Sequence, residues 1–323
     1  MYLSLTIPVF VMGMMGYIQY YQTRRSSNRI SSSQLGLKKL ELVRKLLEHV
    51  PQHRGVANAV LQGDESFRSK LAALQSRIDT EINMVHDADS GQDARYLSTR
   101  LQNIAIQWED IKRNLTQLSA AESFRKHTDL IAEITYVISD VGEASGLFLN
   151  LDQKFYGLID ATINKLPLVT EFLGQARGLG MGVAAAGKCT IANKVKLAYR
   201  HKKVSAVWND AEHAIKKALQ YTPELKAIAE NKVNNNKNSI SNFLAILNAE
   251  LLQMDKIKIA PDVYFNAGTE AIQDSFALLD VMIDILQSQL VAKARLVSKK
   301  VFWSSVFGSI SIVPMISYLY LAL

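Results

Sequence analysis

The chain has 323 residues, of which 48% are apolar and 21% charged, with a formal net charge of +7 at pH 7 and one cysteine, Cys189. The apolar content excludes a disordered chain, and only sixteen glycines and six prolines disfavour an all-β fold with its many turns. The lone cysteine excludes an intramolecular disulfide framework and any metal or iron–sulfur site built from several cysteines.

The first predicted element is a membrane anchor over residues 1–22, which carry no charged side chain. At about 1.5 Å per residue, a helix of this length crosses a hydrocarbon core about 30 Å thick. Four tyrosines would lie where interfacial aromatic residues gather: Tyr2, Tyr17, Tyr20 and Tyr21. A cleaved signal peptide is the alternative, but the segment lacks a basic start and an A-x-A-like cleavage site. We therefore predict an uncleaved anchor, followed by a basic juxtamembrane linker over residues 23–36.

Residues 37–300 are predicted to be helical. Apolar residues recur every three or four positions, as in Leu40, Val43, Leu47 and Val50. Helices are predicted over residues 93–118, 121–138, 154–165, 191–219 and 239–254, with breaks at 87–92, 142–152, 222–223, 231–238 and 260–262. No stretch shows sustained strand-like alternation. The predicted fold class is therefore all-α: two related helical bundles joined in one unit, flanked by N- and C-terminal transmembrane helices.

A short repeat supports the prediction of two related bundles. Residues 46–55, LLEHVPQHRG, align without a gap with residues 169–178, VTEFLGQARG. The identical pairs are Glu48 and Glu171, Gln52 and Gln175, Arg54 and Arg177, and Gly55 and Gly178. Pro51 and Gly174 occupy equivalent positions, where each is expected to weaken or bend its helix. Chance similarity between amphipathic helices is the alternative.

The last predicted element is a second transmembrane helix over residues 301–323, which are also uncharged and include Trp303, Tyr318 and Tyr320. Basic residues flank the inner ends of both apolar segments: Arg24, Arg25, Arg29, Lys38 and Lys39, and Lys293, Arg295, Lys299 and Lys300. The positive-inside rule then predicts that the central domain lies in the cytoplasm and that both chain ends lie on the other side of the membrane. These nine basic residues exceed the net charge of +7, so the rest of the chain is close to neutral. We therefore expect the basic residues to contact membrane lipid, and we expect no binding to nucleic acid.

Arg54 and Arg177 fall on the apolar faces of their predicted helices. A buried guanidinium does not lose its proton, so burial is costly unless an anion or several carbonyl groups meet it. One alternative is a carboxylate from another helix. The other is that both arginines converge on a small planar oxyanion, whose flat edge suits the guanidinium fork. Gly55 and Gly178 follow the two arginines and would leave the backbone open for an N–H contact with the same ligand.

These motifs resemble the nitrate- and nitrite-sensing (NIT) domain, an all-helical module of bacterial chemoreceptors, sensor kinases and antitermination regulators. The resemblance covers roughly residues 37–295 and rests on Gln52–Gly55, Gln175–Gly178 and Tyr264–Ile272. It implies that Arg54 and Arg177, one from each bundle, hold nitrate or nitrite with help from backbone amides. It also implies that the membrane is the bacterial inner membrane, and it makes a periplasmic central domain the alternative to the cytoplasmic one. His53 and Ala176 depart from the acidic or polar residues that often precede the arginines in relatives.

The sequence thus predicts a membrane-anchored, non-enzymatic sensor of a small inorganic anion, nitrate or nitrite. Its predicted ligand-binding residues are Arg54, Arg177, Gly55 and Gly178. No kinase, methyl-accepting or RNA-binding segment follows, so the output is expected to reach a separate signalling protein or to pass through a homo-oligomer. A structural or scaffolding membrane protein without a ligand is the main alternative, and an α-helical pore-forming protein is the third.

Three other patterns are assigned structural roles, and no catalytic residue, cofactor or metal site is predicted. The spacing Gly178-x-Gly180-x-Gly182 differs from that of nucleotide-binding loops, so close helix packing is expected. His49 and His53 lie four residues apart without an evident third metal ligand, and surface or satisfied histidines are expected. The asparagine-rich residues 231–238 predict a solvent-exposed loop.

Overall fold

The computed structural model describes the backbone of residues 3–88 and 95–322, and the side chains of residues 11, 14–88 and 97–306. Every element assigned within these ranges is helical, so the all-α prediction is confirmed. Met1, Tyr2 and Leu323 of the predicted anchors, and part of the predicted break at 87–92, lie outside the described residues.

Ten α-helices are assigned within the described ranges: α1 (Leu3–Leu61), α2 (Arg68–Asp87), α3 (Arg95–Asn114), α4 (Ala120–Ala144), α5 (Leu147–Asn150), α6 (Tyr156–Asp160), α7 (Leu166–Ala186), α8 (Ile191–Gln220), α9 (Pro223–Ile246) and α10 (Pro261–Ala322). Short 3₁₀ turns lie at Glu65–Phe67, Leu115–Gln117 and Gln153–Phe155. Two π-helical stretches extend neighbouring helices, η4 (Ala161–Lys165) before α7 and η5 (Leu247–Leu252) after α9.

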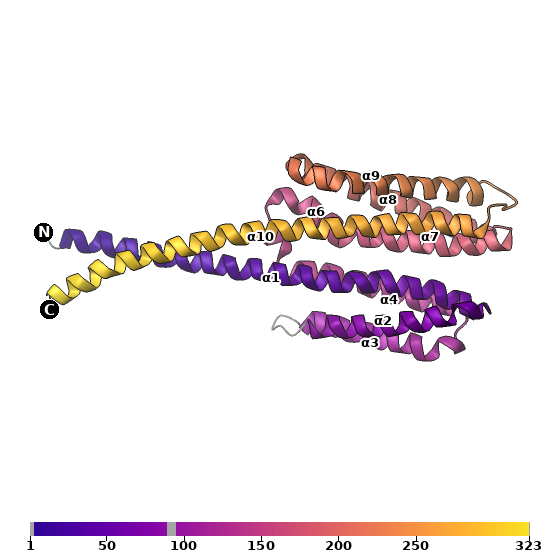
Figure 1. Cartoon of the computed structure of the whole chain (residues 1–323), viewed down its shortest axis with the longest axis horizontal. Coiled ribbons are helices and arrows are strands. Elements are labelled where there is room, and N and C mark those ends of the chain that lie inside the picture. The colour runs from indigo at the N-terminus through magenta and orange to yellow at the C-terminus, as the bar shows by residue number, and fades with distance from the viewer. Residues whose placement is uncertain (1–2, 89–94, 323) are drawn as a thin grey trace.

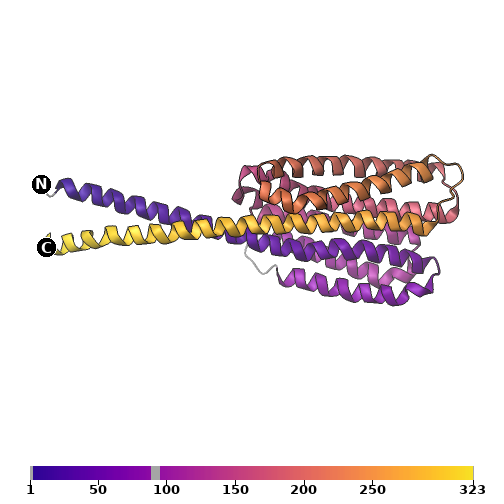
Figure 2. The ribbon, with the colours of Figure 1, turned by 45° about the horizontal axis from the view of Figure 1, so that its top comes forward.

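The helices form two bundles that share a central pair, α1 and α10. Figure 1 shows α9 and α8, then α10 and α7, then α1 and α4, and finally α2 and α3, stacked from top to bottom. The first bundle contains α1 to α4 and the second α7 to α10, with α5 and α6 between them. Because α1 and α10 run in opposite directions and pack on each other, they join the bundles and bring both chain ends to one side (Figure 2).

Local sequence signals mark several helix boundaries. Ser119 and Glu122 form a capping box at the start of α4, and Thr190 caps α8 by accepting from the Asn193 amide. Gly187 ends α7 in the left-handed conformation, with a φ of 63°, which favours glycine. Pro223, the second residue of the predicted break at 222–223, is the first residue of α9.

The predicted loop at residues 231–238 is wrong, because these residues are helical within α9. Their buried positions, Val233 and Asn236, continue to Ile240 at helical spacing, so the helix packs on the core despite its polar composition. Asn236 is 0% exposed, and its Oδ1 accepts a hydrogen bond of 2.8 Å from Ser275 Oγ of α10. The partner that permits burial of this amide lies on another helix, which composition alone does not reveal.

Both ends of the chain continue as helices beyond the bundles (Figure 2). Residues 23–36, the predicted linker, form part of the continuous helix α1. Along the extensions, Tyr17 is 68% and Trp303 is 56% exposed. In the portion of the chain that was searched, Pro261–Val306 is long and apolar enough to cross a membrane, although half of its most apolar window is buried inside the protein. Membrane spanning by the two ends stays a prediction.

Candidate anion-binding site

Helix α1 carries Arg54 into the contact between the two bundles, where the residue is 3% exposed. Its Nη1 and Nη2 donate to Oε1 and Oε2 of Glu171 on α7, at 2.7 and 3.1 Å. Nη1 also donates to Thr128 Oγ1 at 2.9 Å, and the guanidinium carbon lies 4.7 Å from the centre of the Phe124 ring. Arg54 is therefore buried, as its position on the apolar face predicts, and a carboxylate from the other bundle meets it.

Arg177 on α7 lies in a similar setting but without a carboxylate. Its Nη1 donates to Thr269 Oγ1 at 2.8 Å, and its guanidinium carbon lies 4.6 Å from the centre of the Phe265 ring. Among the side chains that the structure describes, this half-buried guanidinium has no ion-pair partner. Burial and the nearby charge of Arg54 lower the pKa of Arg177 to about 10. The two cations thus lie close enough for each to raise the electrostatic energy of the other.

The same pair of residue types holds each arginine. Phe124 and Thr128 of α4 contact Arg54, and Phe265 and Thr269 of α10 contact Arg177. In each pair the threonine hydroxyl also donates to the phenylalanine carbonyl four residues earlier, at 2.8 Å. We call each Phe–Thr pair an arginine cradle. Sequence reasoning missed these cradles, although the spacing Phe-x-x-x-Thr occurs in both FRKHT and FNAGT.

Three glycines let helices approach one another near the site. A Cβ atom on Gly174 would lie 3.2 Å from Arg54 Nη2, and one on Gly268 would lie 2.9 Å from Arg177 Cγ. A Cβ on Gly180 would lie 2.3 Å from the Tyr264 ring, which confirms the predicted close packing at that glycine. In contrast, a Cβ on Gly182 would meet nothing within 4 Å.

The other predicted site glycines, Gly55 and Gly178, are exposed and lie inside α1 and α7. Within a helix the amide N–H donates to the carbonyl four residues earlier, which favours the arginine side chains over these amides as ligand donors. A Cβ on Gly178 would lie 3.6 Å from Phe124 of the first cradle, whereas one on Gly55 would meet nothing within 4 Å. The structure thus places Gly178 beside the cradle of Arg54.

Glu171 belongs to a longer hydrogen-bonded network. Gln175 Nε2 donates to Glu171 Oε1 at 2.6 Å, and Arg200 Nε of α8 donates to Gln175 Oε1 at 3.0 Å. The network and Arg177 together contain three guanidinium groups and one carboxylate, so this region carries an excess of positive charge. Glu48, the repeat partner of Glu171, instead bonds Arg44 within α1.

A buried histidine pair lies behind Arg54 and was not predicted. His53 Nδ1 and His127 Nε2 are 2.8 Å apart, and His127 Nδ1 lies 2.6 Å from the Ser123 carbonyl. Because that carbonyl only accepts, His127 donates to it and receives the proton of His53. Burial lowers the pKa of His53 to about 3 and that of His127 to about 4, and each shift has a further contribution from a neighbouring cation or histidine. The pair is therefore neutral at pH 7.

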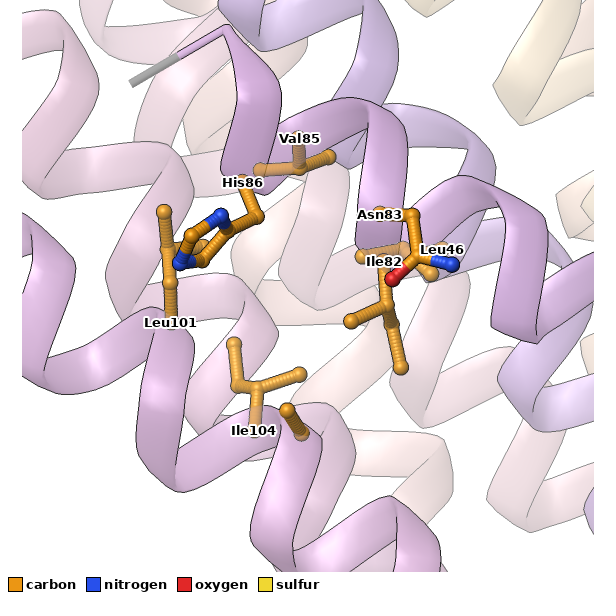
Figure 3. A pocket seen from close by; sticks show the side chains of 8 residues that line it. Leu46, Ile82, Asn83, Val85, His86, Leu101 and Ile104 are labelled. Atoms are coloured by element: carbon orange, nitrogen blue, oxygen red, sulfur yellow. The ribbon is translucent and has the colours of Figure 1, made fainter. Parts of the chain in front are cut away.

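The described side chains form no metal centre that would compete with the arginines as a ligand site. No group of three or more His, Cys, Asp or Glu residues with metal-binding geometry occurs among the residues searched. A cavity of about 210 Å³ opens between α1, α2 and α3, but it is lined mainly by apolar side chains such as Leu46, Ile82 and Leu101 (Figure 3). Asn83 and His86 are its polar residues, so this cavity lacks the positive charge that an anion needs.

Comparison with known proteins identifies the family of this helical arrangement. The sequence profile described as "Nitrate and nitrite sensing" matches residues 45–287, which is most of the chain. The chain belongs to the NIT family. The matched NIT region contains Arg54, Arg177, Glu171 and both cradles.

A solved structure, that of the NasR transcription antiterminator, shares the fold of this NIT protein. The TM-score is 0.64, and the match covers 90% of this chain and 82% of the other at 14% sequence identity. At that identity the similarity establishes the fold alone. A search of curated proteins gave no match.

Proposed function

We propose that this NIT protein is a membrane-anchored, non-enzymatic sensor that binds nitrate or nitrite between Arg177 and Arg54. The observation that carries the proposal is the guanidinium of Arg177, which is half-buried, lacks a carboxylate partner among the described side chains, and lies within the electrostatic reach of Arg54. An anion between the arginines would relieve their mutual repulsion. The family assignment supports nitrate or nitrite as the ligand.

The shape of the arginines favours a planar oxyanion. A guanidinium group presents parallel N–H donors, and nitrate and nitrite present a flat O–N–O edge that accepts two such bonds. The Phe–Thr cradles hold the arginine planes in place before the ligand arrives, which lowers the entropic cost of binding. We include Gly55 and Gly178 in the proposed site because each directly follows one of the two arginines, and because Gly178 lies beside Phe124 of the first cradle.

Signal transmission would follow the two long helices. Arg54 lies on α1, whereas the cradle of Arg177 lies on α10, and α1 and α10 pack together and extend toward the chain ends. A ligand that reorients both arginines changes the contacts of both helices, and a packed helix pair can pass such a change over a distance if two states exist. The receiver is proposed to be a separate signalling protein or a second copy of the chain.

The membrane part of the proposal rests on the apolar ends of these helices. Residues 1–22 and 301–323 carry no charge, and basic residues follow the first segment and precede the second. We propose that both segments span the bacterial inner membrane, with residues 37–300 as a cytoplasmic sensory domain and a periplasmic domain as the alternative. A reporter that is active only in the periplasm, fused after residue 323, tests the orientation. Reporter activity would place that end in the periplasm and would therefore support a cytoplasmic central domain.

Ligand binding is tested with the full chain in detergent. Nitrate or nitrite should raise the melting temperature by an amount that grows with the logarithm of one plus the ratio of ligand concentration to Kd, whereas chloride at equal ionic strength should not raise it. Arg177→Gln should abolish the shift. Arg68→Gln is a matched control, because Arg68 is an exposed arginine paired with Glu65. A nitrate shift that survives both Arg177→Gln and Arg54→Gln would contradict the proposed site.

A structural or scaffolding membrane protein without a ligand is the second candidate. The observation that favours it is the pair formed by Arg54 and Glu171, because this arginine already has a protein counter-ion. In that case nitrate and nitrite would change the melting temperature and the heat of titration no more than chloride does at the same concentration. The absence of a nucleic-acid partner stays a prediction.

A further inference from the structure

The carboxylate of Glu171 resembles the proposed ligand in shape and charge. It is a planar O–C–O group with one negative charge, and both of its oxygens accept bonds from Arg54, at 2.7 and 3.1 Å. Nitrite and nitrate present the same kind of edge to a guanidinium. Glu171 is 7% exposed and comes from the opposite bundle, so it occupies the face of Arg54 that an anion between the bundles would need.

The second half of the molecule lacks such a group. Glu48 corresponds to Glu171 in the repeat, but its carboxylate bonds Arg44. Arg177 keeps only its cradle, with Thr269 as its hydrogen-bond partner. Of two arginines in matching cradles, one has an internal anion and the other has none among the described side chains.

We infer that Glu171 is an internal competitor for Arg54, so that an oxyanion bridging the two arginines binds by exchange with this carboxylate. This inference rests on the proposed function and names the residue that regulates the same site. The exchange keeps one negative charge on Arg54 and adds the contact with Arg177. A ligand must therefore replace two directed hydrogen bonds, which a flat oxyanion does and a spherical chloride does not.

The support of Glu171 gives the exchange a structural consequence. Gln175 holds Glu171 Oε1 and is itself held by Arg200 of α8. Release of the carboxylate from Arg54 would change the hydrogen bonds between α7 and α8 as well as those between α7 and α1. The ligand would in this way loosen one contact between the bundles and create another through its own oxygens.

The test compares Glu171→Gln with Glu48→Gln in the full chain in detergent. Sodium nitrate is titrated by calorimetry at constant ionic strength, with sodium chloride as the spherical control. Glu171→Gln removes the competing charge, so we expect the Kd for nitrate to be lower than that of the wild type by a factor of about ten or more. Glu48→Gln should leave the affinity unchanged. Adding Arg54→Gln to Glu171→Gln should remove the gain.

Three results would overturn the inference in distinguishable ways. If Glu171→Gln binds nitrate as the wild type does, or more weakly, Glu171 is a fixed part of the site and no exchange occurs. If Glu48→Gln has the same effect as Glu171→Gln, the gain reflects net charge and not competition. If neither the wild type nor any variant binds nitrate or nitrite, the proposed function fails, and the exchange fails with it.

A second variant covers the case in which Glu171→Gln does not fold. Gln175→Met keeps the charge of Glu171 but removes the hydrogen bond from Gln175 Nε2. It should tighten nitrate binding by a few-fold, because the carboxylate leaves Arg54 more easily. Weaker or unchanged binding in a folded Gln175→Met protein would count against competition by Glu171.

Discussion

The two halves of the molecule hold their arginines alike but fill the space behind them differently. Behind Arg54 lies the buried pair of His53 and His127. The repeat places Ala176 at the position of His53, and the common Phe-x-x-x-Thr spacing places Gly268 at the position of His127. In the second half the space is filled by two aromatic rings. Tyr264 donates to the Ala176 carbonyl at 3.1 Å, and Phe243 Cε2 lies 2.9 Å from where a Gly268 Cβ would stand.

This difference gives two similar arginines different surroundings. Arg54 has a carboxylate and a neutral polar pair around it, so its position is determined by many directed contacts. Arg177 has apolar packing and one threonine, and its positive charge is not balanced by a neighbouring carboxylate among the described side chains. The comparison teaches that the same Phe–Thr cradle holds an arginine in two different settings: one with a carboxylate counter-ion, and one without such a counter-ion among the described side chains.

The largest expected difference between the halves is in stability. Arg54→Ala leaves the buried carboxylate of Glu171 without its cation and should lower the free energy of unfolding by about 3–5 kcal/mol. Arg177→Ala breaks no ion pair and should cost about 1 kcal/mol. Denaturant unfolding of the two variants measures both. Replacing Arg54 and Glu171 together by Met and Leu should recover part of the loss, and equal losses for the two single variants would contradict the comparison.

The histidine pair should make the first half sensitive to acid. The folded-state pKa values of His53 and His127, about 3 and 4, lie below the unfolded value of about 6.5, so the unfolded chain binds more protons as the pH falls. The contribution of the two histidines to the free energy of unfolding is therefore fully present above about pH 6.5 and decreases as the pH falls toward 4. Between pH 7 and pH 5 the loss should be about 2 kcal/mol for each histidine.

The measurement is denaturant unfolding at several pH values. His53→Met and His127→Met should each reduce the slope of stability against pH between pH 7 and 5. His213→Met is the control, because His213 is exposed. A wild-type protein whose stability is unchanged over this interval would show that the pair is not neutral and buried in solution.

Close packing in the second half gives a smaller effect. Gly180→Ala places a methyl group against the buried ring of Tyr264, and it should destabilise the protein by about 1–3 kcal/mol because that ring has little room to move. Gly182→Ala is the matched control two residues away, where the added methyl meets nothing, and it should stabilise the helix by up to about 1 kcal/mol. Thermal unfolding of both variants tests the predicted difference in sign.

The smallest expected effects come from the cradles. Thr128→Val and Thr269→Val each remove one hydrogen bond to an arginine and should cost about 1 kcal/mol. The two variants should differ in ligand response, because Arg54 keeps Glu171 whereas Arg177 loses its hydrogen-bond partner. Nitrate titration should show weaker binding for Thr269→Val than for Thr128→Val. Equal binding by both would mean that the two arginines are positioned equally well without their threonines.

Much of the fold follows from local patterns in the sequence. The predicted helices at residues 121–138 and 191–219 lie within α4 and α8, because apolar spacing and caps act within a few turns of one helix. The prediction of a loop at 231–238 was wrong because it used local composition alone, whereas a contact with another helix decides the structure there. Its asparagines are typical of a loop when local sequence is considered alone, but Ser275 of α10 donates a hydrogen bond to Asn236 in the core.

The sequence by itself determined that the protein is all-α, that a motif recurs, and that Arg54 and Arg177 lie on faces with an apolar pattern. It left open what would meet the arginines. Only the tertiary structure decided that Glu171 meets Arg54, that the cradles come from α4 and α10, and that Arg177 has no carboxylate beside it in the described part of the chain. Helix spacing is a property of neighbouring residues, whereas the partner of a buried charge depends on which helices pack together.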